Sequence, residues 1–278
     1  MMKSVYRRLT KSFSRPAKVE IYPRVDVFSW QPGDGRINFG DCLAKIVVER
    51  VLMAGGRTRH DETMVAKRLL AIGSVLHFAE NGDVIWGSGV NGKIPEQMHR
   101  FESLDVRAVR GPLTADFLAK RGIQVPKIYG DPGLLIPHLF PRFVKRTADR
   151  EYSFVPNLHD LEASRHQPNT LSPLWGWNVV IDHIIRSKFI VASSLHGLVI
   201  AEAYGIPARY VRLSPSEDIF KYQDYYYGTG RENFTFAKSV EEALEMGGMP
   251  PPIFDHQRLL DAFPWDLWSL PEADEILR

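Results

Sequence analysis

The segment from 188 to 213 constrains the fold most, because it has the pattern of a β-α-β unit. The apolar run Phe189–Ala192 predicts a buried strand, and Ser193 and Ser194 are residue types that commonly cap a helix start. A helical pattern follows, and the run Ala208–Leu213 predicts a second strand. His196 would therefore lie where a buried strand turns into a helix, at the carboxyl edge of a sheet.

Anionic ligands collect at such a position, because unpaired backbone N–H groups and the positive end of the helix dipole meet there. Two interpretations of His196 stay open from this segment alone. It is either an inert polar residue that closes the helix start, or a functional group beside a bound anion.

The same alternation of strand and helix patterns runs through most of the chain and predicts an α/β protein. Further strands are predicted at Val25–Trp30, Leu69–Ile72, Val84–Trp86, Val106–Val109 and Tyr152–Val155, and helices at 41–54, 113–121 and 178–187. The rhythm breaks between 137 and 150, where two prolines and a basic cluster occur. We therefore expect two Rossmann-like domains that face a cleft, residues 1–145 and 146–278.

The C-terminal part has a different composition, with three prolines followed by Phe254, Phe263, Trp265 and Trp268. We expect it to pack back across the domain junction, although a surface for a partner is an alternative.

Composition argues for a cytoplasmic protein without nucleic acid as a partner. The net charge of +2 is too small for a nucleic-acid protein, and no basic stripe interleaved with aromatic residues occurs. The single cysteine, Cys42, excludes an internal disulfide. No apolar run approaches the ~20 residues that span a bilayer.

The first 19 residues carry six basic residues and no acidic one. They are either a solvated tail or a short basic amphipathic segment that touches an anionic membrane surface. Peripheral contact with the inner face of the membrane would matter if the substrate is lipid-linked.

Four loops of the first half follow predicted strands, where ligands bind in open α/β folds. They span 36–41, 86–92, 110–114 and 130–132. Asn38 and Asp41 can cap the next helix, and Gly40 permits close approach to the backbone. Gly87, Ser88 and Gly89 suggest an anion-binding nest.

The other two loops carry charged side chains. Arg110 lies at a strand end, where a guanidinium can grip a carboxylate or a phosphate, and a surface ion pair is the alternative. Asp131, flanked by glycine and proline, is at least as well suited to holding its turn as to contacting a substrate.

Taken in order, these segments resemble the polysaccharide pyruvyl transferase family. The resemblance extends from about Asn38 to Arg231, and it rests on Asn38-Phe-Gly-Asp41, Trp86-Gly-Ser-Gly89, Val109-Arg-Gly-Pro-Leu-Thr114, Gly130-Asp-Pro132 and Ser193-Ser-Leu-His-Gly197. The family implies a two-domain fold like that of GT-B glycosyltransferases. It also implies transfer of pyruvate from phosphoenolpyruvate to a sugar hydroxyl pair, which makes a cyclic ketal on a lipid-linked oligosaccharide during exopolysaccharide or cell-surface polysaccharide biosynthesis.

Under this resemblance His196, Arg110 and Asp41 are the expected catalytic residues. His196 would protonate the enol or neutralise the departing phosphate, and Asp41 would deprotonate the acceptor. The expected donor-binding residues are Asn38, Gly40, Gly87, Ser88, Gly89, Ser193, Ser194 and Gly197, and the expected acceptor-binding residues are Lys221, Tyr225 and Arg231. Phosphoenolpyruvate is the expected donor substrate, with no cofactor and no metal; the oligomeric state stays open.

The chain departs from the family pattern at two positions. Many members carry an arginine or lysine where this chain has Ser194, and a histidine where it has Asn157. Arg231, Lys221 or Arg212 would have to supply the missing charge, and His159 the missing imidazole. A GT-B-type glycosyltransferase that uses a nucleotide-sugar, and a non-catalytic sugar- or anion-binding module, stay open as alternatives.

Overall fold

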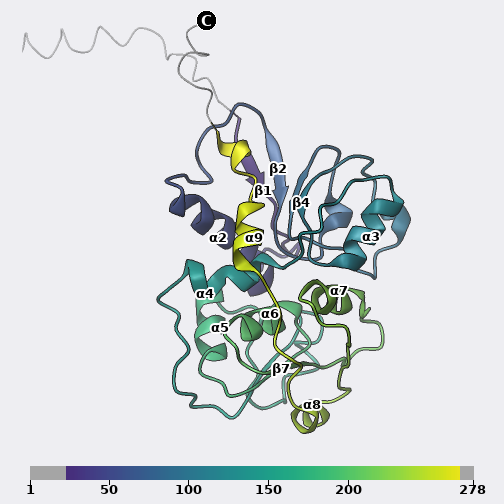
Figure 1. The fold of residues 1–278 in the computed structure, drawn as a ribbon. Coiled ribbons are helices and arrows are strands. Elements are labelled where there is room, and N and C mark those ends of the chain that lie inside the picture. Colours follow the sequence, from purple (N-terminus) through teal and green to yellow (C-terminus); the bar gives the residue numbers. More distant parts are fainter. Residues whose placement is uncertain (1–22, 270–278) are drawn as a thin grey trace, which may run out of the picture.

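The computed structural model describes residues 23–269 and contains two separate parallel sheets (Figure 1). The first has the order β1-β2-β3-β4 and is built from Val25–Val27, Lys67–Leu70, Val84–Trp86 and Asp105–Ala108. The second has the order β5-β6-β7 and is built from Ser153–Val155, Ile190–Ala192 and Ala208–Tyr210. The prediction of an α/β protein with parallel sheets is confirmed.

α-Helices make three of the crossovers between parallel strands, from β1 to β2, β5 to β6 and β6 to β7, whereas β2–β3 and β3–β4 are joined by segments that contain only a short 3-10 turn. In the first half, α2 (Phe39–Ala54) lies between β1 and β2, and α3 (Pro112–Lys120) follows β4. In the second half, α5 (Trp177–Ile184) precedes β6 and α6 (Leu195–Ala203) joins β6 to β7. The remaining helices are α4 (Ile136–Leu139), α7 (Phe220–Gly228), α8 (Val240–Met246) and α9 (His256–Asp261), with short 3-10 segments at Leu76–Phe78, Glu96–Met98, Pro132–Leu135 and Trp265–Trp268.

Several predicted strands end earlier than their apolar runs. The strand in the run Val25–Trp30 ends at Val27. The strand in the run Ala208–Leu213 ends at Tyr210, and Val211 adds a single bridge to Ala237. In both, the carboxyl end of the run leaves the sheet and enters the loops at the sheet edge. By contrast, Val84–Trp86 has the predicted bounds, because glycine follows it directly.

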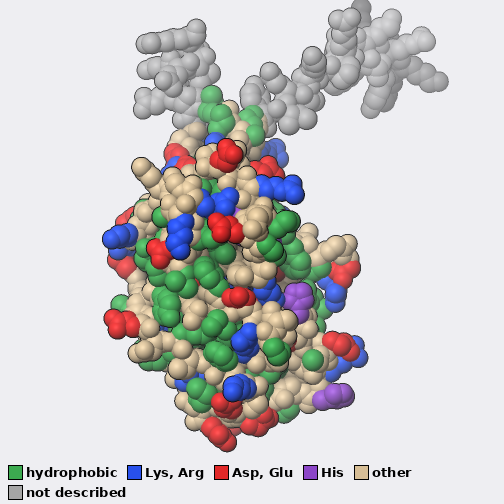
Figure 2. Space-filling model, turned by 90° about the vertical axis from the view of Figure 1, so that its right-hand side faces the viewer, with side chains coloured by type: hydrophobic (Ala, Val, Ile, Leu, Met, Phe, Trp, Pro, Cys, Tyr) green, Lys and Arg blue, Asp and Glu red, His purple; other side chains and the backbone are tan. Residues whose placement is uncertain are grey.

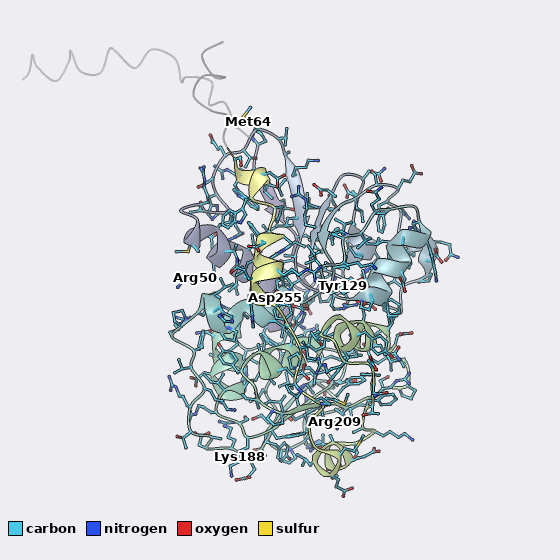
Figure 3. The ribbon with its side chains drawn as sticks, viewed as in Figure 1. Arg50, Met64, Tyr129, Lys188, Arg209 and Asp255 are labelled. Atoms are coloured by element: carbon cyan, nitrogen blue, oxygen red, sulfur yellow. The ribbon has the colours of Figure 1, made fainter. Side chains whose placement is uncertain are left out.

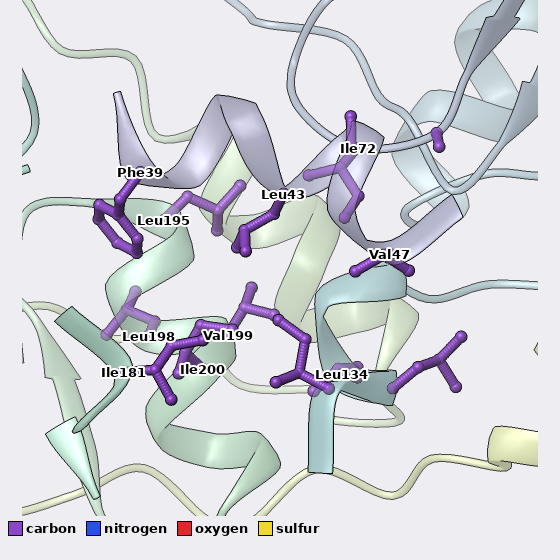
Figure 4. Packing of buried hydrophobic residues seen from close by; sticks show 14 of the residues in the cluster. Phe39, Leu43, Val47, Ile72, Leu134, Ile181, Leu195, Leu198, Val199 and Ile200 are labelled. Atoms are coloured by element: carbon purple, nitrogen blue, oxygen red, sulfur yellow. The ribbon is translucent and has the colours of Figure 1, made fainter. Parts of the chain in front are cut away.

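One hydrophobic cluster runs through both halves. Phe39, Leu43 and Val47 on α2 face Leu195, Leu198 and Val199 on α6, with Leu134 beside them (Figure 4). The backbone N–H of Phe39 also donates to the carbonyl of Pro173, 2.8 Å away. Helix α2 therefore begins against the second half of the chain. The division into domains at 145/146 stays a prediction.

The C-terminal segment runs from the second half back onto the first. Asp255, which caps α9, lies at the level where the two halves meet (Figure 3). The indole Nε1 of Trp86 donates to the carbonyl of Leu259 at 2.9 Å, and the ring of Phe263 packs edge-on against Trp86 with centroids 4.9 Å apart. This segment covers one face of β3.

The charged side chains are mixed in sign on the surface in view in Figure 2, where basic and acidic groups alternate among apolar ones. None of the helices between residues 23 and 269 combines the length and the apolar character needed to cross a bilayer. The basic N-terminal segment discussed above lies outside the described residues.

Candidate active site

A pocket of about 240 Å³ lies between the two halves. Both halves contribute polar side chains to its wall. The lining includes Asn38, Asp41, Ser74, His77, Asn91, Lys93, Asn157, His159, Ser194, His196 and Lys221, together with Trp30, Val75, Phe78, Leu158 and Leu195. Five of the predicted site residues thus meet in one place: Asn38, Asp41, Ser194, His196 and Lys221.

Two helix N-termini open onto this pocket. Asn38 caps α2, and its side-chain oxygen accepts from the N–H of Gly40 at 2.9 Å. Ser194 caps α6, and its hydroxyl accepts from the N–H of Gly197 at 3.4 Å. The positive ends of both helix dipoles therefore make the electrostatic potential in the pocket more positive, which favours a negatively charged ligand.

His196 lies in the first turn of α6 and is 8% exposed. A Cβ added to Gly40 would lie 2.2 Å from its Nδ1, so only glycine permits this contact between α2 and the imidazole. The Nε2 atom is buried without a hydrogen-bond partner among the described residues, and it lies 3.9 Å from Oδ2 of Asp131.

Asp131 is fixed by its other oxygen, which accepts from the N–H of Gly133 at 2.8 Å. Its Oδ2 likewise has no hydrogen-bond partner in the described part of the chain. The Gly-Asp-Pro pattern around Asp131 is compatible with either a turn-holding role or contact with a substrate. In the structure Asp131 holds its turn and also lies beside His196. The local sequence around Asp131 does not predict this proximity.

Burial controls the charge on this pair. Desolvation, followed by the nearby positive charges of Lys221 and Arg110, lowers the pKa of His196 to about 3. Desolvation raises the pKa of Asp131 to about 6. These surroundings keep His196 neutral at neutral pH, and the negative charge of a bound anion would favour its cationic form.

Asp41 also lines the pocket, in the first turn of α2. Desolvation raises its pKa to about 7, against the opposing charge of Lys221. A carboxyl group with that pKa can both give and take a proton near neutral pH.

The pocket also contains groups that sequence reasoning did not select. Lys93 and His77 come from the first half, and His159, considered only as a substitute imidazole, comes from the second. Burial lowers the pKa of His77 to about 4. The only sequence signal for Lys93 is its position directly after the glycine-rich loop at 86–92.

Arg110 has a structural environment different from the one expected. Its side chain is fully buried and does not line the pocket as the described residues define it. Its Nη2 lies 2.9 Å from Oδ2 of Asp224 on α7 and donates to the carbonyl of Val90 at 2.7 Å. Its Nη1 donates to the hydroxyl of Ser74 at 2.6 Å, and Ser74 does line the pocket. Arg110 thus joins the two halves directly behind the pocket wall.

The glycine-rich loop does not present an open nest. The N–H groups of Gly87 and Gly89 already donate to Ala108 and Gly73, and the hydroxyl of Ser88 donates to Gly73. A Cβ on Gly89 would lie 2.5 Å from the Arg110 guanidinium. The N–H groups of Gly87 and Gly89 are therefore not free to bind an anion, and Gly89 packs against the Arg110 side chain instead.

Two further predicted residues support the wall from behind. The hydroxyl of Ser193 accepts from the N–H of Asn157 at 3.0 Å, and Gly197 packs so closely on Val155 that a Cβ would lie 2.8 Å from it.

Tyr225 and Arg231, predicted to bind the acceptor, lie in a buried cluster around Glu202. The hydroxyl of Tyr225 donates to Glu202 at 2.6 Å, and Nη1 of Arg231 donates to the same carboxylate at 2.7 Å. Neither side chain belongs to the described pocket wall. Tyr222, Tyr225 and Tyr226 are spaced i, i+3 and i+4 on α7, so they share one face, and that face is buried in the core. The expected role of Tyr225 and Arg231 in binding the acceptor does not fit this packing.

No cluster of three or more His, Cys, Asp or Glu side chains arranged to hold a metal ion occurs between residues 23 and 269.

Comparison with known proteins places this architecture in a family. Residues 20–215 match the profile of the family described as polysaccharide pyruvyl transferase. The succinoglycan biosynthesis protein ExoV of Rhizobium meliloti (strain 1021) is 31% identical over 210 residues, which cover 71% of this chain and 63% of ExoV. The chain therefore aligns with less than two thirds of that relative's length.

Two other relatives have no described activity. An uncharacterized protein of Acanthamoeba polyphaga mimivirus is 25% identical over 219 residues, covering 73% of this chain and 74% of the viral protein. A crystal structure of an uncharacterized protein from Klebsiella pneumoniae subsp. pneumoniae NTUH-K2044 superimposes with a TM-score of 0.50 at 12% identity, covering 78% of this chain and 93% of that one. That likeness concerns the fold alone. The profile match across most of the chain, together with the order of its motifs, shows that this protein belongs to the polysaccharide pyruvyl transferase family.

Proposed function

We propose that this protein transfers pyruvate from phosphoenolpyruvate to two hydroxyls of a saccharide and releases inorganic phosphate. The observation that carries the proposal is the placement of His196 at a helix N-terminus, in a polar pocket that also holds Asp41 and Lys221. Family membership and the similarity to ExoV, a succinoglycan biosynthesis protein, support an exopolysaccharide or related cell-surface polymer as the product.

The chemistry needs acid, base and anion-binding groups. A proton delivered to C3 of phosphoenolpyruvate makes C2 electrophilic, and the first sugar hydroxyl adds to C2 and loses its proton. The C2–O bond to phosphate then breaks, phosphate takes the electron pair, and the second hydroxyl adds and loses its proton. One of the two hydroxyl protons balances the proton delivered to C3, and the other leaves with phosphate.

His196 suits the handling of the anionic donor. Phosphoenolpyruvate brings phosphate and carboxylate charges into a buried site, and nearby negative charge raises the pKa of an imidazole. His196 would then become cationic only with the donor in place, either to protonate C3 or to neutralise the departing phosphate.

Asp41, from the first half of the chain, is the candidate base. With a pKa of about 7 it can accept a proton from the attacking hydroxyl. The reverse assignment, with Asp41 as the acid, uses the same geometry. The solvent-deuterium experiment below, carried out on variants of both residues, separates the two assignments.

The reaction as written needs no redox cofactor, because the gain of a C–O bond at C2 is balanced by the gain of a C–H bond at C3, so the pyruvyl unit is neither oxidised nor reduced. We propose no metal either, because ammonium groups of the pocket can balance the donor's charge. We also propose a GT-B-like arrangement of the two halves and a lipid-linked oligosaccharide acceptor at the inner face of the cell membrane.

The test is acceptor-dependent phosphate release from phosphoenolpyruvate by the purified protein in D₂O, with a lipid-linked oligosaccharide extract as acceptor. The expected product is a saccharide whose ketal methyl group carries one deuteron from solvent. His196→Ala should abolish phosphate release, whereas the matched variant His166→Ala, at an exposed position, should retain it.

Retention of proton transfer to C3 in His196→Ala, together with its loss in Asp41→Asn, would assign the acid to Asp41. Release of a nucleotide from a nucleotide-sugar, with no turnover of phosphoenolpyruvate, would support the glycosyltransferase alternative and refute the proposal.

A further inference from the structure

Glu217 lies between two lysines of the pocket wall that come from different halves of the chain. Lys93 follows the glycine-rich loop of the first half, and Lys221 is in the first turn of α7. The Nζ of Lys221 lies 2.5 Å from Oε1 of Glu217, and Lys93 pairs with Oε2 of the same carboxylate. The Glu217 side chain is 4% exposed, against 14% for Lys221 and 29% for Lys93.

The segment that carries Glu217 is held from its backbone. Nε of Arg212 donates to the carbonyl of Glu217 at 2.9 Å, and Nη2 donates to the carbonyl of Pro215 at 2.7 Å. A Cβ on Gly92 would lie 2.7 Å from Asp218, so the loop before Lys93 packs directly on this segment. The backbone that carries the carboxylate is thus fixed, whereas the two lysines reach it through long flexible side chains.

The other candidate cations for the donor are already occupied. Arg110 is paired with Asp224, Arg231 is paired with Glu202, and Arg212 is bonded to backbone carbonyls. Lys93 and Lys221 are the ammonium groups in the described pocket wall, on the same cavity as Ser194 and His196.

We propose that Lys93 and Lys221 together bind the phosphate group of the donor, and that Glu217 competes with that phosphate for the same two ammonium groups. The inference rests on the proposed function for the identity of the donor. Before the donor binds, Glu217 neutralises one of the two positive charges and holds the lysines in place. On binding, phosphate oxygens replace carboxylate oxygens as acceptors, and the carboxylate's negative charge opposes the incoming anion.

This arrangement predicts effects of opposite sign for neighbouring residues. Removal of either ammonium group weakens anion binding, because a charged hydrogen bond is lost. Removal of the Glu217 charge strengthens it, because the repulsion and the competition both disappear while the shape of the side chain is kept in glutamine. A residue that only maintained the pocket's structure would weaken binding when it is substituted.

The experiment is isothermal titration of the full-length protein, without acceptor, with inorganic phosphate, phosphoenolpyruvate and UDP as separate probes. Lys93→Met and Lys221→Met should raise the Kd for phosphate by about tenfold, and Glu217→Gln should lower it by about threefold or more. The matched controls Lys120→Met and Glu245→Gln, at exposed positions of α3 and α8, should leave the Kd unchanged. Added salt should weaken binding in the wild type, as for any charged site.

Weaker or unchanged phosphate binding by Glu217→Gln would overturn the competition, and unchanged binding by Lys93→Met would overturn the paired site. Thermal denaturation of each variant identifies any that fail to fold. If a variant of Glu217 or Lys221 does not fold, Lys93→Met still tests the phosphate site, because Lys93 is the most exposed of the three side chains. If the variants show the predicted changes in Kd with UDP and the protein does not bind phosphoenolpyruvate, the phosphate site is supported and the proposed donor is refuted.

Discussion

The imidazole Nε2 of His196 lies 3.9 Å from Oδ2 of Asp131, and both atoms are buried. A movement of about 1 Å would bring them within the distance of a charged hydrogen bond. Such a bond would form when the imidazole becomes cationic, with Nε2–H as the donor, and it would fix the orientation of the ring. Asp131 is therefore a positioning residue for His196.

Asp131→Asn tests this relationship, because an asparagine oxygen can still accept from Gly133 while the negative charge is gone. We expect kcat to fall by about tenfold or more, with KM for phosphoenolpyruvate changed by less than about twofold. The pH dependence of kcat should shift as well. A fall in thermal stability with an unchanged pH profile would instead mean that Asp131 only holds its turn.

Gly40→Ala tests the contact between α2 and the imidazole. Alanine is the better helix former by up to about 1 kcal/mol, so any loss of function comes from the collision of its Cβ with Nδ1 of His196. Displacement of a catalytic group by about 1 Å can cost about a hundredfold in kcat. Steady-state kinetics measure the effect. Gly33→Ala is the control, since a Cβ there meets no atom within 4 Å; equal activity of the two variants would contradict the prediction.

The ion pair between Arg110 and Asp224 should be important for stability. Asp224 accepts from the N–H and the hydroxyl of Thr114 at 2.9 and 2.6 Å as well as from Arg110, and both charged side chains are fully buried. Asp224→Ala leaves a buried guanidinium without its partner and should lower the free energy of unfolding by about 3–5 kcal/mol.

Urea unfolding measures that loss, with Asp116→Ala on the exposed side of α3 as the control. The double variant Arg110→Met/Asp224→Leu should lose less than Asp224→Ala, because no unpaired charge remains. A double variant less stable than the single one would show that the pair contributes net stability.

Asp41→Asn should reveal the raised pKa of Asp41 through the pH dependence of stability. The folded pKa of about 7 lies above the ordinary 3.8, so the folded state binds this proton more tightly than the unfolded state does. The contribution of Asp41 is therefore most favourable at low pH and is lost as pH rises through about 7. Relative to the wild type, Asp41→Asn should become more stable between pH 5 and pH 8.

Urea unfolding at these two pH values measures the difference, and Asp116→Asn, which is exposed, provides the reference. A stability difference that does not change with pH would contradict the raised pKa.

The sequence by itself determined the local architecture of this protein. Short windows of the chain determine the strand and helix patterns, the capping residues Asn38 and Ser194, and the position of His196 at the start of α6. The order of the motifs was enough to indicate the family, which the profile match confirms.

Only the tertiary structure decided which side chains meet. Arg110 pairs with a carboxylate 114 positions away, Tyr225 and Arg231 turn inward onto Glu202, and Lys93 joins Lys221 across the two halves. These contacts depend on how α2, α6 and α7 pack against one another. Periodicity shows that a helix has a buried face, but it does not show which charged group will lie opposite that face after packing. The identity of that opposite group decides whether a charged side chain is paired in the core or reaches the pocket.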